Sequence, residues 1–160
     1  MAQLLRATTA DVQDGFLTLL DPKGNRDLPR RHPIPLEGIA DTIINEAVDR
    51  ARLLKTNLLF SSTGKAQLSP STVSIYVTVV STSFIQSGIS KKPFTLSDVR
   101  RTIETRLAGM GVSKDVRANL QSHGLNGIQI RHYDKHDYEK EKRDALRLLH
   151  QWIKARGIAA

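Results

Sequence analysis

Polar segments between residues 94 and 138 hold the side chains of this chain that are best suited to chemistry, among them Arg100, His123 and Tyr133. An arginine guanidinium presents planar donors to two oxygens of a phosphate or carboxylate, and histidine transfers protons near neutral pH. A tyrosine hydroxyl, with an ordinary pKa near 10, becomes a nucleophile when a neighbouring base or positive charge assists its ionisation. Taken singly, such residues more often pack, cap a helix or form surface ion pairs. Their order along the chain is therefore what counts.

Several other kinds of active site are not indicated. The five histidines form no His-Glu-x-x-His pattern, and His132 and His136 lack a nearby third ligand of the expected kind. There is no Gly-x-Ser-x-Gly motif, P-loop or dinucleotide-binding glycine pattern. The chain has no cysteine, which excludes a thiol nucleophile, a cysteine-bound metal and a disulfide scaffold. We therefore expect neither a metal nor a nucleotide cofactor.

The charge of the chain predicts a polyanionic partner. The 160 residues carry a formal net charge of +8, and the first 80 are nearly neutral. Residues 81–160 hold 15 basic and 8 acidic side chains. A concentrated positive region favours nucleic acid because neutralising phosphates releases condensed counterions. The alternative is a solvated surface whose charge keeps the protein in solution.

Taken in order, the polar segments resemble the catalytic domain of the tyrosine recombinases, the phage-integrase family. Members of that family carry a His-x-x-Arg box that opens a helix, a Leu-x-x-His box at the end of the next helix, and a nucleophilic tyrosine shortly afterwards. Ser97 and Arg100 fall on the first box, His123 on the second, and Tyr133 on the nucleophile. Upstream, the turn around Lys23 is similar to the hairpin that presents the family's catalytic lysine. The resemblance covers nearly the whole chain.

The resemblance implies a site-specific recombinase or integrase that cuts and rejoins double-stranded DNA without metal or nucleotide. Tyr133 would form a 3′-phosphotyrosyl bond, and Arg100 and His123 would bind the scissile phosphate. Lys23 would protonate the leaving 5′-hydroxyl as the general acid. It further implies a homotetramer assembled on DNA and a cytoplasmic location, bacterial or phage-encoded in a bacterial host, with no membrane partner.

Two departures from the family pattern bear on activity. Ser97 replaces the usual histidine of the first box, and a serine donates a hydrogen bond but is no base near neutral pH. His132 is then a candidate base. The family's first catalytic arginine lies ahead of an acidic position that is Gln3 here, and no arginine of this chain fits it. We therefore expect a catalytic domain truncated at its N-terminal edge, without the N-terminal core-binding domain, that alone is inactive or nearly so.

Two alternatives to a recombinase stay open. A non-catalytic DNA-binding relative would keep the scaffold with an incomplete active site, and Ser97 favours it slightly. A basic protein-interaction module would explain the charge, but it accounts for neither Tyr133 nor the residues that accompany it in order. No apolar run approaches the roughly 20 residues that span a bilayer.

The sequence predicts one α+β domain over residues 1–160, mostly helical, with a small antiparallel sheet near the N-terminus. Residues 2–36 form a β-meander with Lys23 at a hairpin tip, because turn residues separate short apolar runs and proline suits an edge strand. Apolar residues at steps of three and four, with Ser or Thr caps, predict the helices. These are 35–53, 69–86, 95–109, 113–121 and 138–155.

Overall fold

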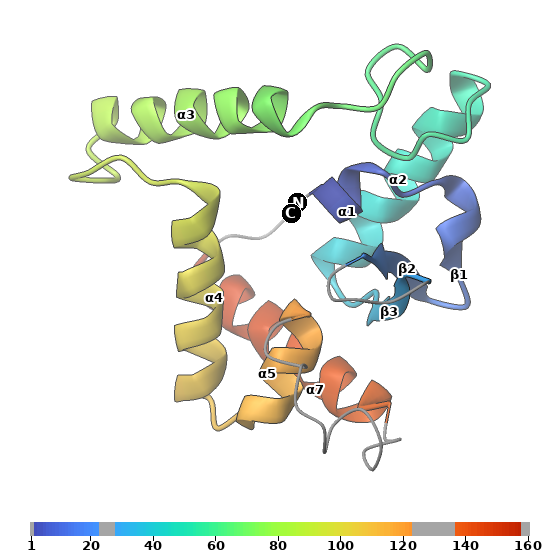
Figure 1. The fold of residues 1–160 in the computed structure, drawn as a ribbon. Coiled ribbons are helices and arrows are strands. Elements are labelled where there is room, and N and C mark those ends of the chain that lie inside the picture. Colours follow the sequence, from blue (N-terminus) through green and yellow to red (C-terminus); the bar gives the residue numbers. More distant parts are fainter. Residues whose placement is uncertain (1, 23–27, 123–136, 158–160) are drawn as a thin grey trace.

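The computed structural model describes residues 2–22, 28–122 and 137–157, which form a mixed α+β fold (Figure 1). Its elements are α1 (Ala2–Leu5), a 3-10 turn (Thr9–Asp11), β1 (Val12–Gln13), β2 (Phe16–Asp21), β3 (Arg30–Pro35), α2 (Ile39–Leu53), α3 (Pro70–Gln86), α4 (Leu96–Gly109), α5 (Lys114–Gln121) and α7 (Glu139–Lys154). The predicted α+β class is confirmed. No helix among these described residues is both long and apolar enough to span a membrane.

The sheet is a three-stranded antiparallel meander in the order β1-β2-β3. Asp14 and Gly15 join β1 to β2 with φ values of 50° and 74°. Positive φ at both central residues is what a two-residue turn of this hand requires, and Asp-Gly is its sequence signal. β3 lies at the edge of the sheet, where Pro33 and Pro35 cost no central ladder bond. The predicted meander and its proline-rich edge strand are thus confirmed from Val12 to Pro35, whereas residues 2–11, predicted as part of the meander, form α1 and the 3-10 turn instead. The predicted hairpin tip at Lys23 lies outside the described residues.

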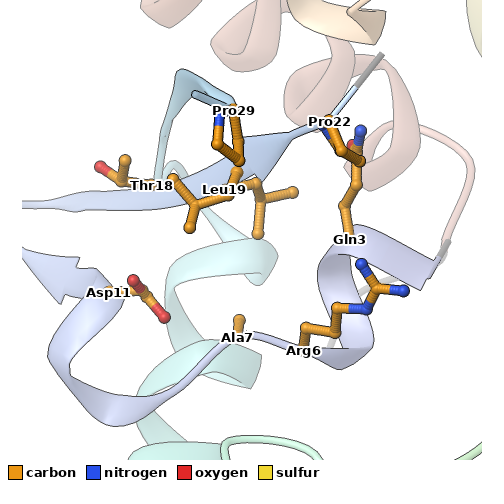
Figure 2. A pocket seen from close by; sticks show the side chains of 9 residues that line it. Gln3, Arg6, Ala7, Asp11, Thr18, Leu19, Pro22 and Pro29 are labelled. Carbon is orange, nitrogen blue, oxygen red and sulfur yellow. The ribbon is translucent and has the colours of Figure 1, made fainter. Parts of the chain in front are cut away.

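A cavity of about 170 Å³ lies between the start of the chain and the sheet (Figure 2). Gln3 and Arg6 line it on one side, and Leu19 and Pro22 line it on another. The Gln3 amide donates a hydrogen bond of 2.6 Å to Asp21, the last residue of β2. The cavity therefore lies beside the polar end of the central strand.

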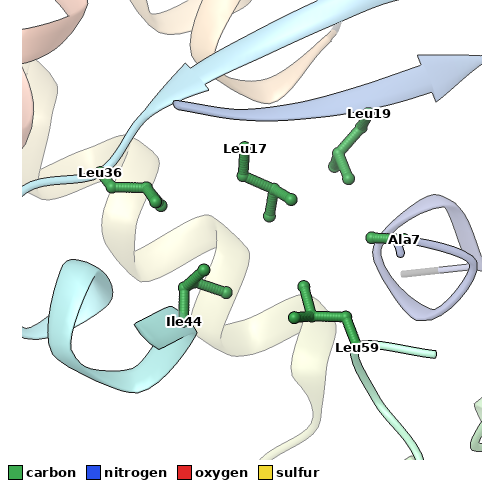
Figure 3. Packing of buried hydrophobic residues seen from close by; sticks show 6 residues of the cluster. All are labelled: Ala7, Leu17, Leu19, Leu36, Ile44 and Leu59. Atoms are coloured by element: carbon green, nitrogen blue, oxygen red, sulfur yellow. The ribbon is translucent and has the colours of Figure 1, made fainter. Parts of the chain in front are cut away.

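Two separate hydrophobic clusters hold the fold. The first joins the sheet to α2 and to neighbouring loops (Figure 3), and its buried members are Ala7, Leu17, Leu19, Leu36, Ile44 and Leu59. The second joins the three C-terminal helices through Leu107 of α4, Val116 of α5 and Ala145 of α7. Leu17 and Leu19 reach the first cluster because alternate side chains of a strand face the same side.

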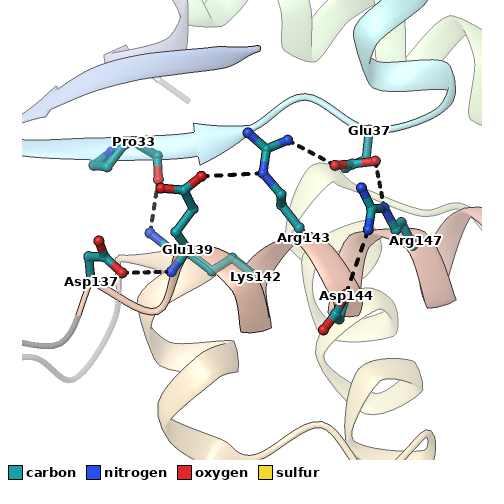
Figure 4. A network of polar contacts seen from close by, with 8 residues as sticks. All are labelled: Pro33, Glu37, Asp137, Glu139, Lys142, Arg143, Asp144 and Arg147. Atoms are coloured by element: carbon teal, nitrogen blue, oxygen red, sulfur yellow. Dashed lines mark hydrogen bonds and ion pairs between the residues drawn. The ribbon is translucent and has the colours of Figure 1, made fainter. Parts of the chain in front are cut away.

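Polar contacts fasten α7 to the end of the sheet (Figure 4). Glu37, which follows β3, accepts hydrogen bonds from Arg143 at 2.9 Å and from Arg147 at 3.0 Å. The Lys142 ammonium donates to the carbonyl of Pro33 at 3.1 Å. Burial acts to raise the pKa of Glu37, but the two arginines outweigh it and hold that pKa below its usual value. The carboxylate therefore joins two turns of α7 to the sheet.

Replacing Glu37 with glutamine is expected to lower the free energy of unfolding by about 1.5–3 kcal/mol, the usual range for hydrogen bonds to charged groups. The Glu37 side chain is only 13% exposed, so water can replace only part of the interaction that the two arginines lose. Urea denaturation measures the change. Glu46→Gln, on an exposed position of α2, is the matched control and should change little. Equal stability of the two variants would contradict a fastening role.

The predicted apolar stripe of the last helix is buried only in part within this chain. Ala145 is 2% exposed, whereas Leu148 is 43% exposed. Trp152 lies between two guanidinium groups, with Arg106 at 5.1 Å and Arg156 at 4.0 Å from the ring. A cation–π contact of this kind contributes about 0.5–1 kcal/mol at an exposed site.

Candidate functional site

The structure describes two of the five predicted site residues. Ser97 and Arg100 lie in the first turns of α4, and both are exposed. Lys23, His123 and Tyr133 lie outside the described residues. The site is therefore described from Arg100 and from the described residues that flank Lys23 or precede His123.

The start of α4 is fixed by a capping box, as the sequence predicted. Thr95 Oγ1 donates to the Asp98 carboxylate at 2.6 Å, and the Thr95 backbone N–H donates to it at 2.8 Å. Arg101 donates to the other carboxylate oxygen at 2.5 Å. The hydrogen bonds from Thr95, and then the one from Arg101, hold the pKa of Asp98 far below its usual range. The ionised Asp98 thus engages Arg101, and Arg100 takes a different partner.

Arg100 reaches across to the end of α5. Its Nε donates to Gln121 Oε1 at 2.8 Å, and one terminal nitrogen donates to the Gln121 backbone carbonyl at 2.7 Å. These bonds occupy two of the five N–H donors of a guanidinium. In the sequence, Gln121 stands two residues before His123. The structure therefore brings the first predicted box to the chain that leads into the second.

A second layer of contacts holds Gln121 in place. Its amide nitrogen donates to Glu104 at 3.0 Å, and the other oxygen of Glu104 accepts from Arg117 at 2.7 Å. Glu104 stands four residues after Arg100, a spacing that predicts an ion pair along one helix. The structure pairs Glu104 with α5 instead, because α4 and α5 pack together in the helical cluster. No sequence signal identifies Gln121 or Arg117, because these partners lie on another helix.

The end of α5 is also bound to the sheet. Ser122 has a left-handed conformation, with φ 50° and ψ 47°. Its hydroxyl donates to Asp21 at the end of β2 and accepts from Arg30 at the start of β3 at 2.8 Å. Asp21 and Arg30 are themselves an ion pair at 3.8 Å. The polar cluster of Asp21, Arg30 and Ser122 therefore joins the strands on either side of residues 23–27 to Ser122, the residue that precedes His123.

Two buried basic side chains lie next to this polar cluster. His32 of β3 donates from Nε2 to the carbonyl of Asn119 at 2.8 Å, and its buried Nδ1 meets no hydrogen-bond partner among the described residues. Burial is the main cause that lowers the pKa of His32; the hydrogen bond to Asn119 opposes it, the charges of Arg30 and Lys142 add to the lowering, and the smallest effect, from Asp21, raises the pKa. Burial also lowers the pKa of Lys142, which is 3% exposed. The sequence identified neither residue as a buried base.

The depressed pKa of His32 predicts that acid destabilises the fold. The unfolded state, in which the pKa is near 6.5, binds a proton that folded His32 resists. The contribution of neutral His32 to the free energy of unfolding is therefore fully present above about pH 6.5. It is lost as the pH falls toward the lower pKa of the folded state, by at most about 1.4 kcal/mol per pH unit.

Urea denaturation at several pH values between about 7.5 and 5 measures this effect as the slope of the free energy of unfolding against pH. This range brackets the ordinary histidine pKa of about 6.5. We expect His32→Gln to flatten the slope. A slope that is unchanged in His32→Gln would show that this imidazole is not the titrating group.

A scan against protein-family models and searches of curated proteins and solved structures found no match to this chain. Among residues 2–22, 28–122 and 137–157, no group of three or more histidine, aspartate or glutamate side chains is placed to hold a metal ion. The arrangement of the described residues can bind an anion at Arg100, close to a junction of three chain segments.

Proposed function

We propose that this chain is a catalytic domain of the tyrosine-recombinase type, which cuts and rejoins double-stranded DNA through a 3′-phosphotyrosyl intermediate. The observation that carries the proposal is the junction at the end of α5. Gln121 binds Arg100 there, while the next residue, Ser122, binds Asp21 and Arg30. Arg100 thus lies close to the residues that flank the segment with Lys23 and to the residues that precede His123. Convergence of these three is what the chemistry requires.

In the proposed reaction, the Tyr133 oxygen attacks phosphorus, the bond from phosphorus to O5′ breaks, and the Tyr133 proton passes to a base. Lys23 transfers a proton to the departing O5′. Rejoining reverses both steps, with a 5′-hydroxyl as nucleophile and tyrosine as leaving group. Cationic side chains placed where negative charge develops stabilise such a transition state.

Arg100 would bind the non-bridging oxygens of the scissile phosphate. A guanidinium is planar and permanently charged, so it can bind two oxygens of one phosphate side by side. Gln121 and Glu104 hold the arginine in a fixed orientation before DNA arrives. In this proposal His123 donates to a phosphate oxygen, and the exposed Ser97 hydroxyl supplies one further donor.

The second candidate function is a non-catalytic DNA-binding relative on the same scaffold. Ser97 favours this candidate, because it stands where the resembled family carries a histidine and a serine is no base near neutral pH. Such a protein would keep Arg100 as a phosphate contact, and its affinity for DNA would fall steeply with salt. The homotetramer on DNA belongs to the first candidate.

A set of DNA duplexes that each carry a nick at a different position tests the first candidate, because cleavage close to a nick releases a short fragment and the covalent complex accumulates. We expect slow accumulation of a denaturant-resistant protein–DNA adduct. DNA binding without an adduct would support the non-catalytic relative, and the absence of DNA binding would reject both candidates.

A further inference from the structure

Arg100 and Glu104 carry opposite charges at neighbouring positions on the surface of α4, yet these two described residues form no ion pair with each other. Four residues separate them, a spacing at which side chains meet along a helix. Instead, Arg100 binds Gln121, and Glu104 binds both Gln121 and Arg117. We propose that Arg117 is a positioning residue that keeps Glu104 away from Arg100, so that Arg100 retains its charge for a phosphate. The proposal rests on Arg100 as the phosphate contact that both candidate functions share.

Glu104 has no other arginine available on its own helix. Arg101 stands three residues before it, but Arg101 already binds Asp98 at 2.5 Å in the first turns of α4. Arg100 is therefore the partner that Glu104 would take along α4. The contacts that α5 offers decide between this pairing and the one observed.

Arg117 holds Glu104 from the side of α5. Its Nε donates to one carboxylate oxygen at 2.7 Å, and a terminal nitrogen donates to the backbone carbonyl of Val112. Val112 packs against the helical cluster, so this second bond fixes the guanidinium in place. The Arg117 side chain is only 17% exposed, and charges near the protein interior attract more strongly than charges in water. Glu104 therefore gains more from Arg117 than it would from the exposed Arg100.

The Gln121 amide lies between the two opposite charges. Its nitrogen donates to the second Glu104 oxygen at 3.0 Å, and its oxygen accepts from Arg100 Nε at 2.8 Å. The reverse orientation would place donors against the guanidinium and an acceptor against the carboxylate, so the amide has one stable orientation. Among the described residues, the partners of Arg100 are thus an amide oxygen and a backbone carbonyl, and neither cancels its charge.

This arrangement matters for phosphate binding. A carboxylate and a phosphate use the same planar donors of a guanidinium, so Glu104 on Arg100 would compete directly with DNA. Held by Arg117, Glu104 leaves Arg100 oriented by neutral groups, with the donors that Gln121 does not use directed to other acceptors. The role of Arg117 is therefore to prevent a competing contact, and it touches no DNA itself.

Salt titrations of the affinity for a DNA duplex, followed by fluorescence anisotropy, test the proposal. We expect Arg117→Met to lower the affinity about tenfold and to reduce the slope against the logarithm of salt by about 0.9, the value for one phosphate contact. Arg117→Lys keeps a charge for Glu104 and should retain most of the affinity. Circular dichroism verifies that each variant is folded.

A second substitution distinguishes this role from a merely structural one. Adding Glu104→Gln to Arg117→Met should restore the affinity, because an amide brings no negative charge to Arg100. Adding Glu46→Gln on an exposed position of α2 restores the same net charge elsewhere and is the matched control, which should restore little. A double variant with Glu104→Gln that binds no better than Arg117→Met would overturn the proposal. If Arg117→Met does not fold, Glu104→Gln alone decides, because a loss of affinity in that variant would also overturn it.

The reaction of Arg100 with phenylglyoxal, located by mass spectrometry, gives a readout without DNA. The reagent attacks the neutral guanidine, a form that an adjacent carboxylate disfavours. Arg100 should react more slowly in Arg117→Met and at the original rate once Glu104→Gln is added. Equal rates in all three proteins would overturn the proposal even where the unchanged chain forms the adduct. The expected rates in a chain that binds no DNA would instead reject the proposed function and leave the role of Arg117 standing.

Discussion

Replacing Tyr133 with phenylalanine is expected to abolish the covalent protein–DNA adduct while leaving the affinity for DNA nearly unchanged. The substitution removes one oxygen, the atom that would attack phosphorus, and no other group at that position can form the bond. Phosphate contacts supply most of the affinity of a basic protein for DNA, and they do not depend on the nucleophile. A gel shift and a denaturing gel of the same samples separate the two effects.

The other two tyrosines of the chain are natural controls. Tyr76→Phe alters an exposed side chain of α3, and Tyr138→Phe alters a side chain packed on the helical cluster. We expect both variants to form the adduct. Loss of the adduct in Tyr138→Phe with retention in Tyr133→Phe would transfer the role of nucleophile to Tyr138. Mass mapping of the adduct from the unchanged chain provides an independent identification.

Local signals in the sequence predicted the helices well. The expected helix start at Ser69-Pro70 is observed, with Ser69 Oγ accepting from the Thr72 backbone at 3.1 Å. The last helix, predicted over 138–155, is observed over Glu139–Lys154. These signals succeed because a cap is a hydrogen bond between residues three apart, so its whole cause lies in a short window.

The contacts that assemble the candidate site could not be predicted in the same way. The bond from Ser122 to Asp21 spans 101 residues, and the bond from Arg100 to Gln121 spans 21. Each depends on how α5 docks against α4 and the sheet, which no local pattern specifies. The same reason explains why α3 was expected as a helix while its exposure was not. An apolar helix without a clear polar side gives no indication of which side is covered.

Replacing Leu107 with alanine is expected to cause the largest loss of stability among the substitutions considered, about 2–5 kcal/mol. Leu107 is 1% exposed, and it packs against Val116 of α5 and Ala145 of α7. Removing its side chain leaves a cavity where three helices meet, and a whole domain is stable by only about 5–15 kcal/mol. Leu148→Ala, at a position 43% exposed on α7, is the matched control and should cost about 1 kcal/mol or less.

The same substitution is expected to act on Arg100 from a distance. Seven residues separate Arg100 from Leu107, which is nearly two helical turns, so both lie on the same side of α4. Loosening the α4–α5 contact at Leu107 should therefore weaken the hydrogen bonds between Arg100 and Gln121. The affinity for DNA should then fall even at temperatures at which the variant is still folded. Urea denaturation and DNA titration at 10 °C measure the two effects. A large loss of stability with unchanged DNA affinity would show that Arg100 does not depend on the helical cluster for its placement.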